Sequence, residues 1–353
     1  MNPCTSFAMK SARKMEYIPA QVVVNRYIRP QYSCPCCEKV FSGKKCRHIS
    51  FRKSAVEPSV VAQVVISKYT DHLPLYRQQH IFSRMGVEVP VSTMADMVGV
   101  AGAALAPLAK LLRHELLTRD VIHADETSLR LLDTRKGGKS CSGWLWAYVS
   151  GERSGPPVVC FDSQTGRALR YPEARLQGWR GGTLVSDGYS VYKSLADNHP
   201  GITSACCWSH ARRGFANLYK ASREPRAAMA LRKKSPAFTA LRNSSATDLW
   251  KKIRQWRQRY SRPIVNDLFA RLEEQEPCCP PEGPLNKAIN YILNRRDELS
   301  CFPGDGAVPP DNNICERAIR PVVMGRKAWL FAGSLMAGNR AAQIMSLLET
   351  AKT

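Results

Sequence analysis

The chain has 353 residues, of which 44% are hydrophobic and 23% charged, as in a folded globular protein with room for two or three domains. Lys and Arg number 52 against 29 Asp and Glu, and the net charge of +23 predicts a polyanionic partner, nucleic acid before any other. We find no apolar run long enough to span a bilayer, and residues 1–10 lack the apolar segment of a signal peptide, so we expect no membrane partner. We therefore expect a cytoplasmic protein, and thirteen scattered cysteines, an odd number, argue against a disulfide framework in that reducing compartment.

Residues 1–52 predict a small β-rich, zinc-ribbon-like module, because strand-forming residues precede a cluster of cysteines. Cys34 and Cys37 have the two-residue gap of a zinc knuckle, whose thiolates can bind one tetrahedral ion. A complete site needs a second ligand pair, and no second Cys-x-x-Cys pair stands upstream. The remaining candidate ligands are Cys4, Cys36, Cys46 and His48. The sequence therefore predicts a zinc module that is incomplete on ligand count.

Residues 53–118 predict a helical region. Valines from Val60 onward recur at helical spacing, Gly86 interrupts the run, and Ser92 is placed to cap a new helix. A further helix is expected over residues 101–117. Helix, glycine-containing turn and capped helix form the pattern of a helix-turn-helix, which binds DNA. A helical hairpin packed on the core fits the same pattern equally well, and the two interpretations stay open.

Residues 119–219 predict the first part of a catalytic core. Strands and helices are expected in the order strand, strand, strand, helix, strand, helix, strand. The expected strands cover residues 121–132, 143–150, 157–162, 182–187 and 201–207. This order is that of an α/β, ribonuclease-H-like core, a mixed sheet with helices on its faces. The first and fourth strands of such a sheet are neighbours.

Residues 220–285 predict a basic, mostly helical insertion, and residues 286–353 predict the C-terminal part of the core. In that last part, Asp311 or Asn312 can cap a helix that carries Glu316 on an early turn. The other elements expected there are a helix over 285–299, a basic-aromatic turn over 325–334 and a final helix over 337–352. The core is thus predicted to be interrupted by the insertion.

Three acids stand out in this arrangement: Asp125 on the first strand, Asp187 at the end of the fourth, and Glu316 on a late helix. Asp125 taken alone is better explained by an edge strand that faces water. Neighbouring strands allow the two aspartates to meet, and a helix across the sheet end can bring the glutamate to them. Clustered carboxylates repel one another unless cations bridge them, and two Mg²⁺ ions fit that need. Glu126, beside Asp125, should point to the opposite face of the strand.

Several longer motifs occur in a fixed order along the chain. They are Ser67-Lys-Tyr-Thr-Asp-His-Leu-Pro-Leu-Tyr-Arg-Gln78, His123-Ala-Asp-Glu-Thr127, Ser186-Asp-Gly-Tyr-Ser-Val-Tyr192, Cys207-Trp-Ser-His-Ala-Arg-Arg-Gly-Phe215, Asp311-Asn-Asn-Ile-Cys-Glu-Arg-Ala-Ile-Arg-Pro321, Gly325-Arg-Lys-Ala-Trp-Leu-Phe-Ala-Gly-Ser334 and Ser346-Leu-Leu-Glu-Thr-Ala-Lys352. With these motifs the chain resembles the insertion-sequence 66 family of bacterial transposases, which belong to the acidic-triad (Asp-Asp-Glu) class. The resemblance runs from about residue 16 to residue 352.

The resemblance implies that Asp125, Asp187 and Glu316 are a metal-binding triad, loaded with two Mg²⁺ or Mn²⁺ ions. It implies DNA cleavage at the ends of a mobile element, followed by transfer of the freed 3′ hydroxyls to target DNA. The implied partners are the terminal inverted repeats, the target DNA, further copies of the chain assembled on DNA, and accessory proteins of the same element. The family's N-terminal segment with an upstream cysteine pair is missing here, which predicts an N-terminally truncated copy.

Two other functions are compatible with the same residues. The truncation and a divergent stretch over residues 233–256 fit a catalytically inactive, DNA-binding remnant. A structure-selective nuclease on the same core needs no element ends.

Basic residues cluster around the predicted acids and are candidate contacts for DNA phosphates. They are Arg212, Arg213, Arg317, Arg320, Arg326 and Lys327. His210 can bond DNA or a carboxylate, or simply pack in its helix. Trp329 and Phe331 can stack on an unpaired base or belong to the core. Asn312 and Asn313 can orient the loop before Glu316 or cap its helix.

Overall fold

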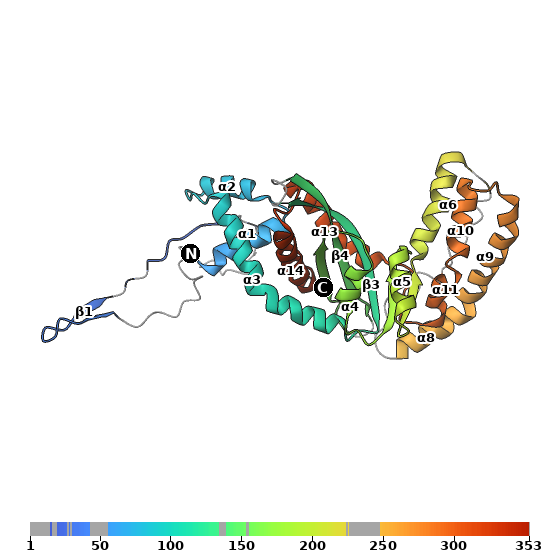
Figure 1. Ribbon diagram of the computed structural model, residues 1–353, viewed down its shortest axis with the longest axis horizontal. Helices are drawn as coiled ribbons and strands as arrows, with labels where there is room; N and C mark the ends of the chain where they lie inside the picture. The colour runs from blue at the N-terminus through green and yellow to red at the C-terminus, as the bar shows by residue number, and fades with distance from the viewer. Residues whose placement is uncertain are drawn as a thin grey trace, which may run out of the picture.

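The computed structural model describes residues 56–133, 139–152, 155–223 and 248–352 of the chain. It also describes residues 15, 20–26, 28, 30–42 and 225. In the described part, a central sheet lies between helices α1 to α3 at one end and helices α6 to α11 at the other (Figure 1). Eleven of the 13 cysteines lie there, and all eleven are free. The candidate zinc ligands Cys4, Cys46 and His48 lie outside the described residues.

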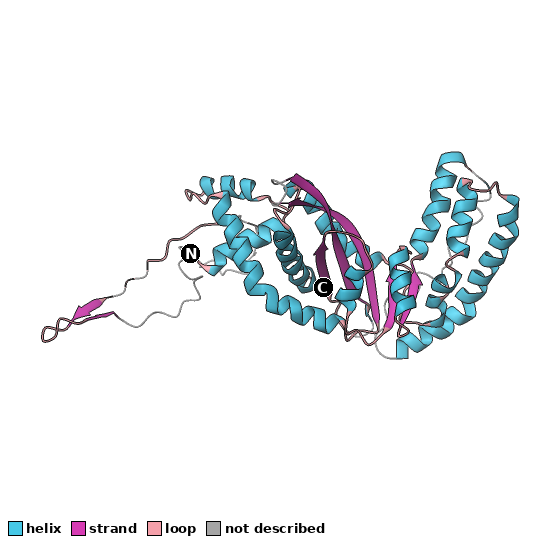
Figure 2. Ribbon diagram, viewed as in Figure 1, coloured by secondary structure: helices cyan, strands magenta, loops and turns pink. Residues whose placement is uncertain are grey.

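The central sheet has five strands in the order β5-β4-β3-β6-β7 (Figure 2). The strands are β3 (Val121–Asp133), β4 (Lys139–Ser150), β5 (Val159–Gln164), β6 (Gly182–Ser186) and β7 (Ile202–Cys206). β3, β4 and β5 form an antiparallel meander, whereas β6 and β7 run parallel to β3. Helices α4 (Arg170–Leu176) and α5 (Ser190–Asn198) connect the last strands. A mixed sheet with the predicted element order, and with first and fourth strands as neighbours, is therefore confirmed.

The two faces of the sheet follow from alternation along β3. Leu129 and Leu131 pack with helices α13 (Asn313–Trp329) and α14 (Leu335–Ala351). Ile122 and Ala124 face a second core that includes residues of α4 and α5. Hydroxyls on α14 also cover the free edge of β5, where Ser346 accepts from the backbone N–H of Phe161 at 2.7 Å and Thr350 accepts from that of Val159 at 3.0 Å. This cover satisfies edge-strand donors that would otherwise need water or another chain.

Three helices precede the sheet: α1 (Pro58–Tyr69), α2 (Leu75–Arg84) and α3 (Val91–Leu116). Gly86 turns the chain between α2 and α3 with a φ of +79°, as its position suggested. Ser92 does not cap a helix: Pro90 occupies the extended N-cap position, so α3 starts one residue before Ser92 and runs unbroken through the helix expected over 101–117. Buried residues of α1 to α3 share one core with α13 and α14, as in a helical hairpin packed on the core.

Helix α3 corrects the expectation that no segment is long enough to cross a membrane. Among the described residues, α3 is the one helix that is long and apolar enough to cross a membrane. Within its apolar window, 28% is buried. Its N-terminal half packs into the core through Met94, Met97 and Ala101. A Cβ on Gly102 would lie 2.8 Å from Cβ of Arg340, so the absence of a side chain there lets α3 approach α14 closely. One such helix is weak evidence for a membrane span, because a core helix can meet the same length and composition test.

The helices beyond β7 form a body with its own core, seen to the right in Figure 1. They are α6 (Trp208–Ser222), α8 (Asp248–Trp256), the π-helical turn Arg257–Ser261, α9 (Arg262–Gln275), α10 (Pro284–Leu293), α11 (Arg296–Leu299) and α12 (Cys301–Gly304). Phe215, Phe269 and Ile289 are buried in that core, which is continuous with Val185 and Ala205 of the sheet. The helical body therefore includes residues past 285, where the predicted insertion ends, because α10 to α12 share its core.

Candidate functional site

Asp125 and Asp187 lie side by side at one end of the sheet. His123 of β3 is paired in parallel register with Val185 of β6, so each aspartate stands two residues beyond that pair on its own strand. Asp187 comes directly after Ser186, the last residue of β6, where its Oδ1 accepts from the backbone N–H of Tyr189 at 2.9 Å. Asp125 Oδ1 accepts from the backbone N–H of the next residue at 2.8 Å. Both carboxylates are partly buried.

Glu316 joins this end of the sheet from the first turn of α13. Burial, followed by repulsion from Asp187, raises the pKa of Asp125 from its ordinary value to about 7. Glu126 and Glu316 add to that repulsion. The predicted acids are therefore close enough to act on one another electrostatically. A group of carboxylates that repel one another suits a bound cation.

Asn312 holds α13 against the sheet. Its Nδ2 donates to the carbonyl oxygen of Ala124 at 2.9 Å, and its Oδ1 lies 2.9 Å from Nδ1 of His123. Its backbone N–H donates to Sγ of Cys207 at 3.2 Å, and its carbonyl oxygen accepts from the N–H of Glu316. Asn312 is fully buried, so these bonds are sheltered from water. The residue thus positions Glu316 relative to β3, a role that the sequence left open.

His123 is the buried partner of Asn312. Burial, with a smaller contribution from the charge of Arg317, lowers the pKa of His123 to about 4, although the hydrogen bond to Asn312 acts in the opposite direction. The ring is therefore neutral at physiological pH. Because Nδ2 of Asn312 is used by the β3 carbonyl, its Oδ1 accepts from a proton on Nδ1 of His123.

Glu126 points to the other face of the sheet, as the alternation predicted. It is buried there, with an ion pair to Arg167 and a hydrogen bond from the hydroxyl of Tyr192 at 2.6 Å. The guanidinium of Arg167 stacks on the rings of Trp144 and Tyr189, with distances of 4.5 and 4.0 Å to the ring centroids. The negative charge of Glu126 is thus balanced by Arg167. Glu126 is therefore not available as a further ligand in the acid cluster.

Arg167→Met is expected to destabilise the protein by about 2 kcal/mol, because it leaves the Glu126 carboxylate buried without its cation. The value is placed below the usual cost of breaking a buried pair, since the Arg167 side chain is 36% exposed. Urea unfolding measures the loss, with Arg170→Met, at an exposed arginine that makes no ion pair with Glu126, as the control. Adding Glu126→Gln to Arg167→Met should recover most of the loss. An unchanged loss in that double variant would contradict the ion-pair explanation.

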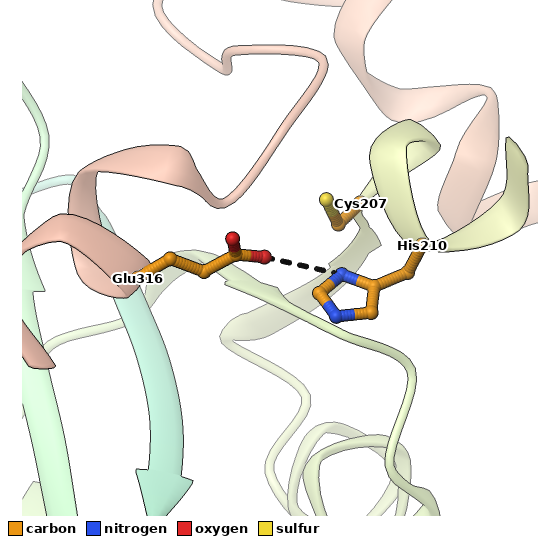
Figure 3. A group of neighbouring side chains, drawn as sticks. All are labelled: Cys207, His210 and Glu316. Carbon is orange, nitrogen blue, oxygen red and sulfur yellow. Dashed lines mark ion pairs between the residues drawn. The ribbon is translucent and has the colours of Figure 1, made fainter. Parts of the chain in front are cut away.

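Glu316 also faces two residues of the α6 region (Figure 3). Cys207, His210 and Glu316 each offer one ligand atom, and these atoms lie within 4.8 Å of one another. Nδ1 of His210 lies 3.5 Å from Oε1 of Glu316, and both atoms are buried without a hydrogen-bond partner among the described residues. Burial, and then Arg213, lowers the pKa of His210. Thiol, imidazole and carboxylate suit a transition metal such as Zn²⁺ or Mn²⁺ better than Mg²⁺.

The predicted phosphate contacts divide into two kinds. Arg212, Arg213, Arg317, Arg320 and Lys327 are exposed. Arg213 also approaches Oε1 of Glu316 at 4.0 Å. Arg326, in contrast, is held on β3, where its Nη1 donates to the side chains of Thr127 and Ser128 at 2.8 and 3.0 Å. The exposed five are free to meet DNA, whereas Arg326 connects α13 to the sheet, and DNA binding by all six stays a prediction.

The helical body supports the turn that carries Asp187. Tyr291 donates from its hydroxyl to the carbonyl oxygen of Asp187 at 2.5 Å, and Arg295 donates to that of Gly188 at 3.1 Å. Gly188 has a φ of +88°, and a Cβ there would lie 2.7 Å from the Tyr291 hydroxyl. Sequence reasoning missed both contacts. The one signal for them is the glycine directly after Asp187, which marks a turn in close contact with another element.

The N-terminal cysteines lie on a hairpin of β1 (Gln31–Ser33) and β2 (Val40–Ser42). Backbone N–H groups of Cys36 and Cys37 lower the pKa of the Cys34 thiol, which favours the thiolate that binds metals. Cys36 and Cys37 are exposed, so the knuckle faces water. A thiolate at such a turn fits a zinc ligand, with Cys37 as the second ligand of the predicted pair, while Cys4, Cys46 and His48 lie outside the described residues.

Two family models match the chain. The model described as "Transposase IS66 family" covers residues 53–340, and that described as "zinc-finger binding domain of transposase IS66" covers residues 9–38. Fold and site define a basic α/β protein with a carboxylate cluster at the end of a mixed sheet. The chain belongs to the IS66 family of transposases.

Curated proteins of Sinorhizobium fredii are similar over nearly the whole chain. The uncharacterized protein y4qI is 33% identical over 97% of this chain and 64% of its own length. The uncharacterized proteins y4hP and y4jD are 29% and 31% identical, over 96% and 97% of this chain and 64% and 68% of their own lengths. The chain thus spans less than two thirds of the first two relatives.

Proposed function

We propose that the chain acts as a DNA transposase, with metal-dependent strand cleavage and strand transfer at the ends of an insertion sequence. The observation that carries the proposal is the carboxylate cluster: Asp125 and Asp187 each stand two residues beyond the paired His123 and Val185, and burial, Asp187 and, more weakly, Glu316 raise the pKa of Asp125 to about 7. Family membership supports it. The strand order β5-β4-β3-β6-β7 supports a ribonuclease-H-like core around that cluster.

Asp125, Asp187 and Glu316 are the residues that would hold Mg²⁺ or Mn²⁺. Bound there, the ions would lower the pKa of the attacking water or DNA hydroxyl and stabilise the leaving oxygen. The fit rests on the raised pKa of Asp125 and on the buried Oε1 of Glu316, which has no hydrogen-bond partner among the described residues. A bound cation would stabilise both carboxylates in their charged form. Cys207 and His210 lie beside Glu316 and can add ligands that favour Mn²⁺ over Mg²⁺.

Other residues of the chain hold the predicted metal ligands in position and supply positive charge for DNA binding. Asn312 and its partner His123 fix the start of α13, while Tyr291 and Arg295 fix the turn after β6. The exposed arginines beside Glu316 bind the DNA backbone, and the net charge of +23 draws DNA to the protein. The partners are the terminal inverted repeats and the target DNA, with further copies of the chain and accessory proteins of the element, in the cytoplasm. The knuckle of Cys34 and Cys37 would hold Zn²⁺.

The direct test incubates the purified chain with DNA duplexes taken from the inverted repeats around its gene, with Mg²⁺, Mn²⁺ or a chelator. We expect nicks at the element ends that need the metal, and joined products when target DNA is present. Salt-sensitive binding without metal-dependent nicks would replace the proposal by that of an inactive DNA-binding remnant. Equal cleavage of end and unrelated duplexes would replace it by a structure-selective nuclease.

A further inference from the structure

Glu316 forms a more compact group with Cys207 and His210 than with the two aspartates. Cys207 is the N-cap residue of α6, His210 lies on the first turn of that helix, and Glu316 on the first turn of α13 (Figure 3). Among the described residues, these three are the one set of His, Cys, Asp or Glu side chains whose ligand atoms all lie within 4.8 Å of one another. Asp125 and Asp187 belong to no such set.

The distance between His210 and Glu316 is that of two ligands of one metal ion. Nδ1 of His210 lies 3.5 Å from Oε1 of Glu316. A tetrahedral ion with bonds of about 2.1 Å to nitrogen and oxygen holds the two ligand atoms about 3.4 Å apart. A water that bridges two polar atoms through hydrogen bonds of about 2.8 Å usually holds them about 4.5 Å apart. Both atoms are buried without a hydrogen-bond partner among the described residues, so the fold itself does not satisfy them.

Cys207 supplies the third ligand and is oriented by the segment that carries Glu316. Its Sγ accepts from the backbone N–H of Asn312 at 3.2 Å, and the carbonyl oxygen of Asn312 accepts from the N–H of Glu316. Hydrogen bonds of this kind orient metal ligands and stabilise a bound thiolate. Burial raises the pKa of the Cys207 thiol, so the metal-free protein keeps the thiol proton, which an entering ion displaces into solvent.

An ion can reach these ligands from solvent. The side chains of His210 and Glu316 are 17% and 26% exposed, so each is in contact with water. Arg213 approaches Oε1 of Glu316 at 4.0 Å, and its side chain is 57% exposed. An exposed ion pair at that distance is weak, so Arg213 can turn outward when a divalent ion enters. The ligand atoms already stand at the spacing of a coordination shell, and the site needs no space larger than the ion.

We propose that Cys207, His210 and Glu316 bind one Zn²⁺ ion, with water as the fourth ligand, and that this ion withholds Glu316 from the acid cluster. Thiolate and imidazole favour Zn²⁺ over Mn²⁺ and Mg²⁺, whereas the oxygens of Asp125 and Asp187 suit Mg²⁺ and Mn²⁺. Zn²⁺ at one side of Glu316 repels a divalent ion at the other and competes with it for the same carboxylate. The competition rests on the proposed function, whereas the Zn²⁺ site does not.

The first test titrates the full chain with Co²⁺, whose bond to a thiolate adds an absorption band in the near ultraviolet, and then displaces Co²⁺ with Zn²⁺. Cys207→Ser keeps an acceptor for the N–H of Asn312. It should lower the affinity at least about 100-fold, since loss of a ligand costs more than the roughly 10–100-fold of an outer-shell change. Cys206→Ser, at the adjacent buried cysteine, is the matched control and should stay within about threefold of the wild-type affinity.

Two further variants locate the ion. His210→Gln, at a partly exposed residue, should weaken Co²⁺ binding as Cys207→Ser does, and thermal melting checks that each variant is folded. Asp125→Asn removes a ligand of the acid cluster and should leave Co²⁺ binding within about threefold of the wild-type affinity. Equal affinities of Cys207→Ser and Cys206→Ser would overturn the proposal. So would a loss in Asp125→Asn as large as that in Cys207→Ser, because the ion would then lie at the aspartates.

The second test measures Mn²⁺ binding through the paramagnetic resonance of the free ion, with and without one equivalent of Zn²⁺. Zn²⁺ should weaken Mn²⁺ binding at least about fivefold in the wild-type chain and have no effect in Cys207→Ser. Undiminished Mn²⁺ binding beside bound Zn²⁺ would overturn the competition. A chain that binds Co²⁺ through Cys207 and His210 but binds no Mn²⁺ would support the Zn²⁺ site and contradict the proposed function, so the two failures are distinguishable.

Discussion

Asp125→Asn is expected to lower metal-dependent cleavage at element ends by at least about 10³-fold and to make the metal-free protein more stable. Asparagine has the shape of aspartate but cannot supply the charge that a divalent ion needs. The pKa of Asp125 is raised to about 7, so ionised Asp125 opposes folding above that pH. At pH 8 the variant should therefore gain about 2 kcal/mol, a figure reduced for partial exposure. The gain should shrink as the pH falls from about 7 towards 4, where Asp125 in the fold is protonated.

Glu126→Gln is the matched control, since it neutralises the adjacent acid on the opposite face of β3. The amide still accepts from the hydroxyl of Tyr192, so cleavage should stay within about threefold of the wild-type rate once the protein is folded. Single-turnover cleavage and thermal melting with and without Mn²⁺ measure both effects. If Asp125→Asn cut DNA at the rate of Glu126→Gln, Asp125 would not be a metal ligand.

The placement of the two aspartates could be predicted from sequence because it depends on local pattern and chain order. Alternation along 121–132 assigns Asp125 and Glu126 to opposite faces, and an apolar segment that ends in Asp187 indicates the end of a buried strand. The register of β3 and β6 then confirms that the two lie at the same end of the sheet. Their metal-binding role stays a prediction.

The contacts of Glu316 could not be derived in the same way. They depend on how α6 and α13 pack, and 105 residues separate Cys207 from Asn312. The spacing of Cys207 and His210 places both at the start of α6, yet spacing does not reveal that they face a glutamate from another helix. The supports from Tyr291 and Arg295 are tertiary contacts for the same reason.

Two helix ends were wrongly predicted from a glycine and a serine. In the structure, tertiary contacts set one of these positions and a proline sets the other. Gly325 was expected in a turn, but α13 continues through it to Trp329. The glycine is required there because a Cβ would collide with Trp329 and His72. At Ser92, the preceding Pro90 already fixes the extended N-cap. Local propensity thus predicted where the helices lie. It did not predict the helix ends where a proline or a contact with another segment determines the backbone.

Asn312→Ala is expected to destabilise the protein by about 4 kcal/mol and to lower cleavage at least about tenfold at temperatures where the variant is folded. The substitution leaves His123 and the carbonyl of Ala124 buried without their partner, and each such group costs about 1–3 kcal/mol. It also frees the first turn of α13, so Glu316 loses its fixed position relative to Asp125. Urea unfolding gives the first effect, and single-turnover cleavage at several Mn²⁺ concentrations gives the second.

Asn313→Ala is the control that the chain itself provides. Asn313 is the adjacent amide, and its backbone N–H, not its side chain, makes the bond to Asp311 at 3.1 Å. Its loss should therefore change stability by less than about 0.5 kcal/mol and leave the metal requirement as in the wild-type chain. Asn312, the N-cap residue of α13, makes no side-chain capping hydrogen bond, so lost helix capping does not explain an effect of Asn312→Ala. Equal effects of the two would show that Asn312 does not position Glu316, whereas a loss confined to Asn312→Ala would show that the buried amide links the sheet to the glutamate.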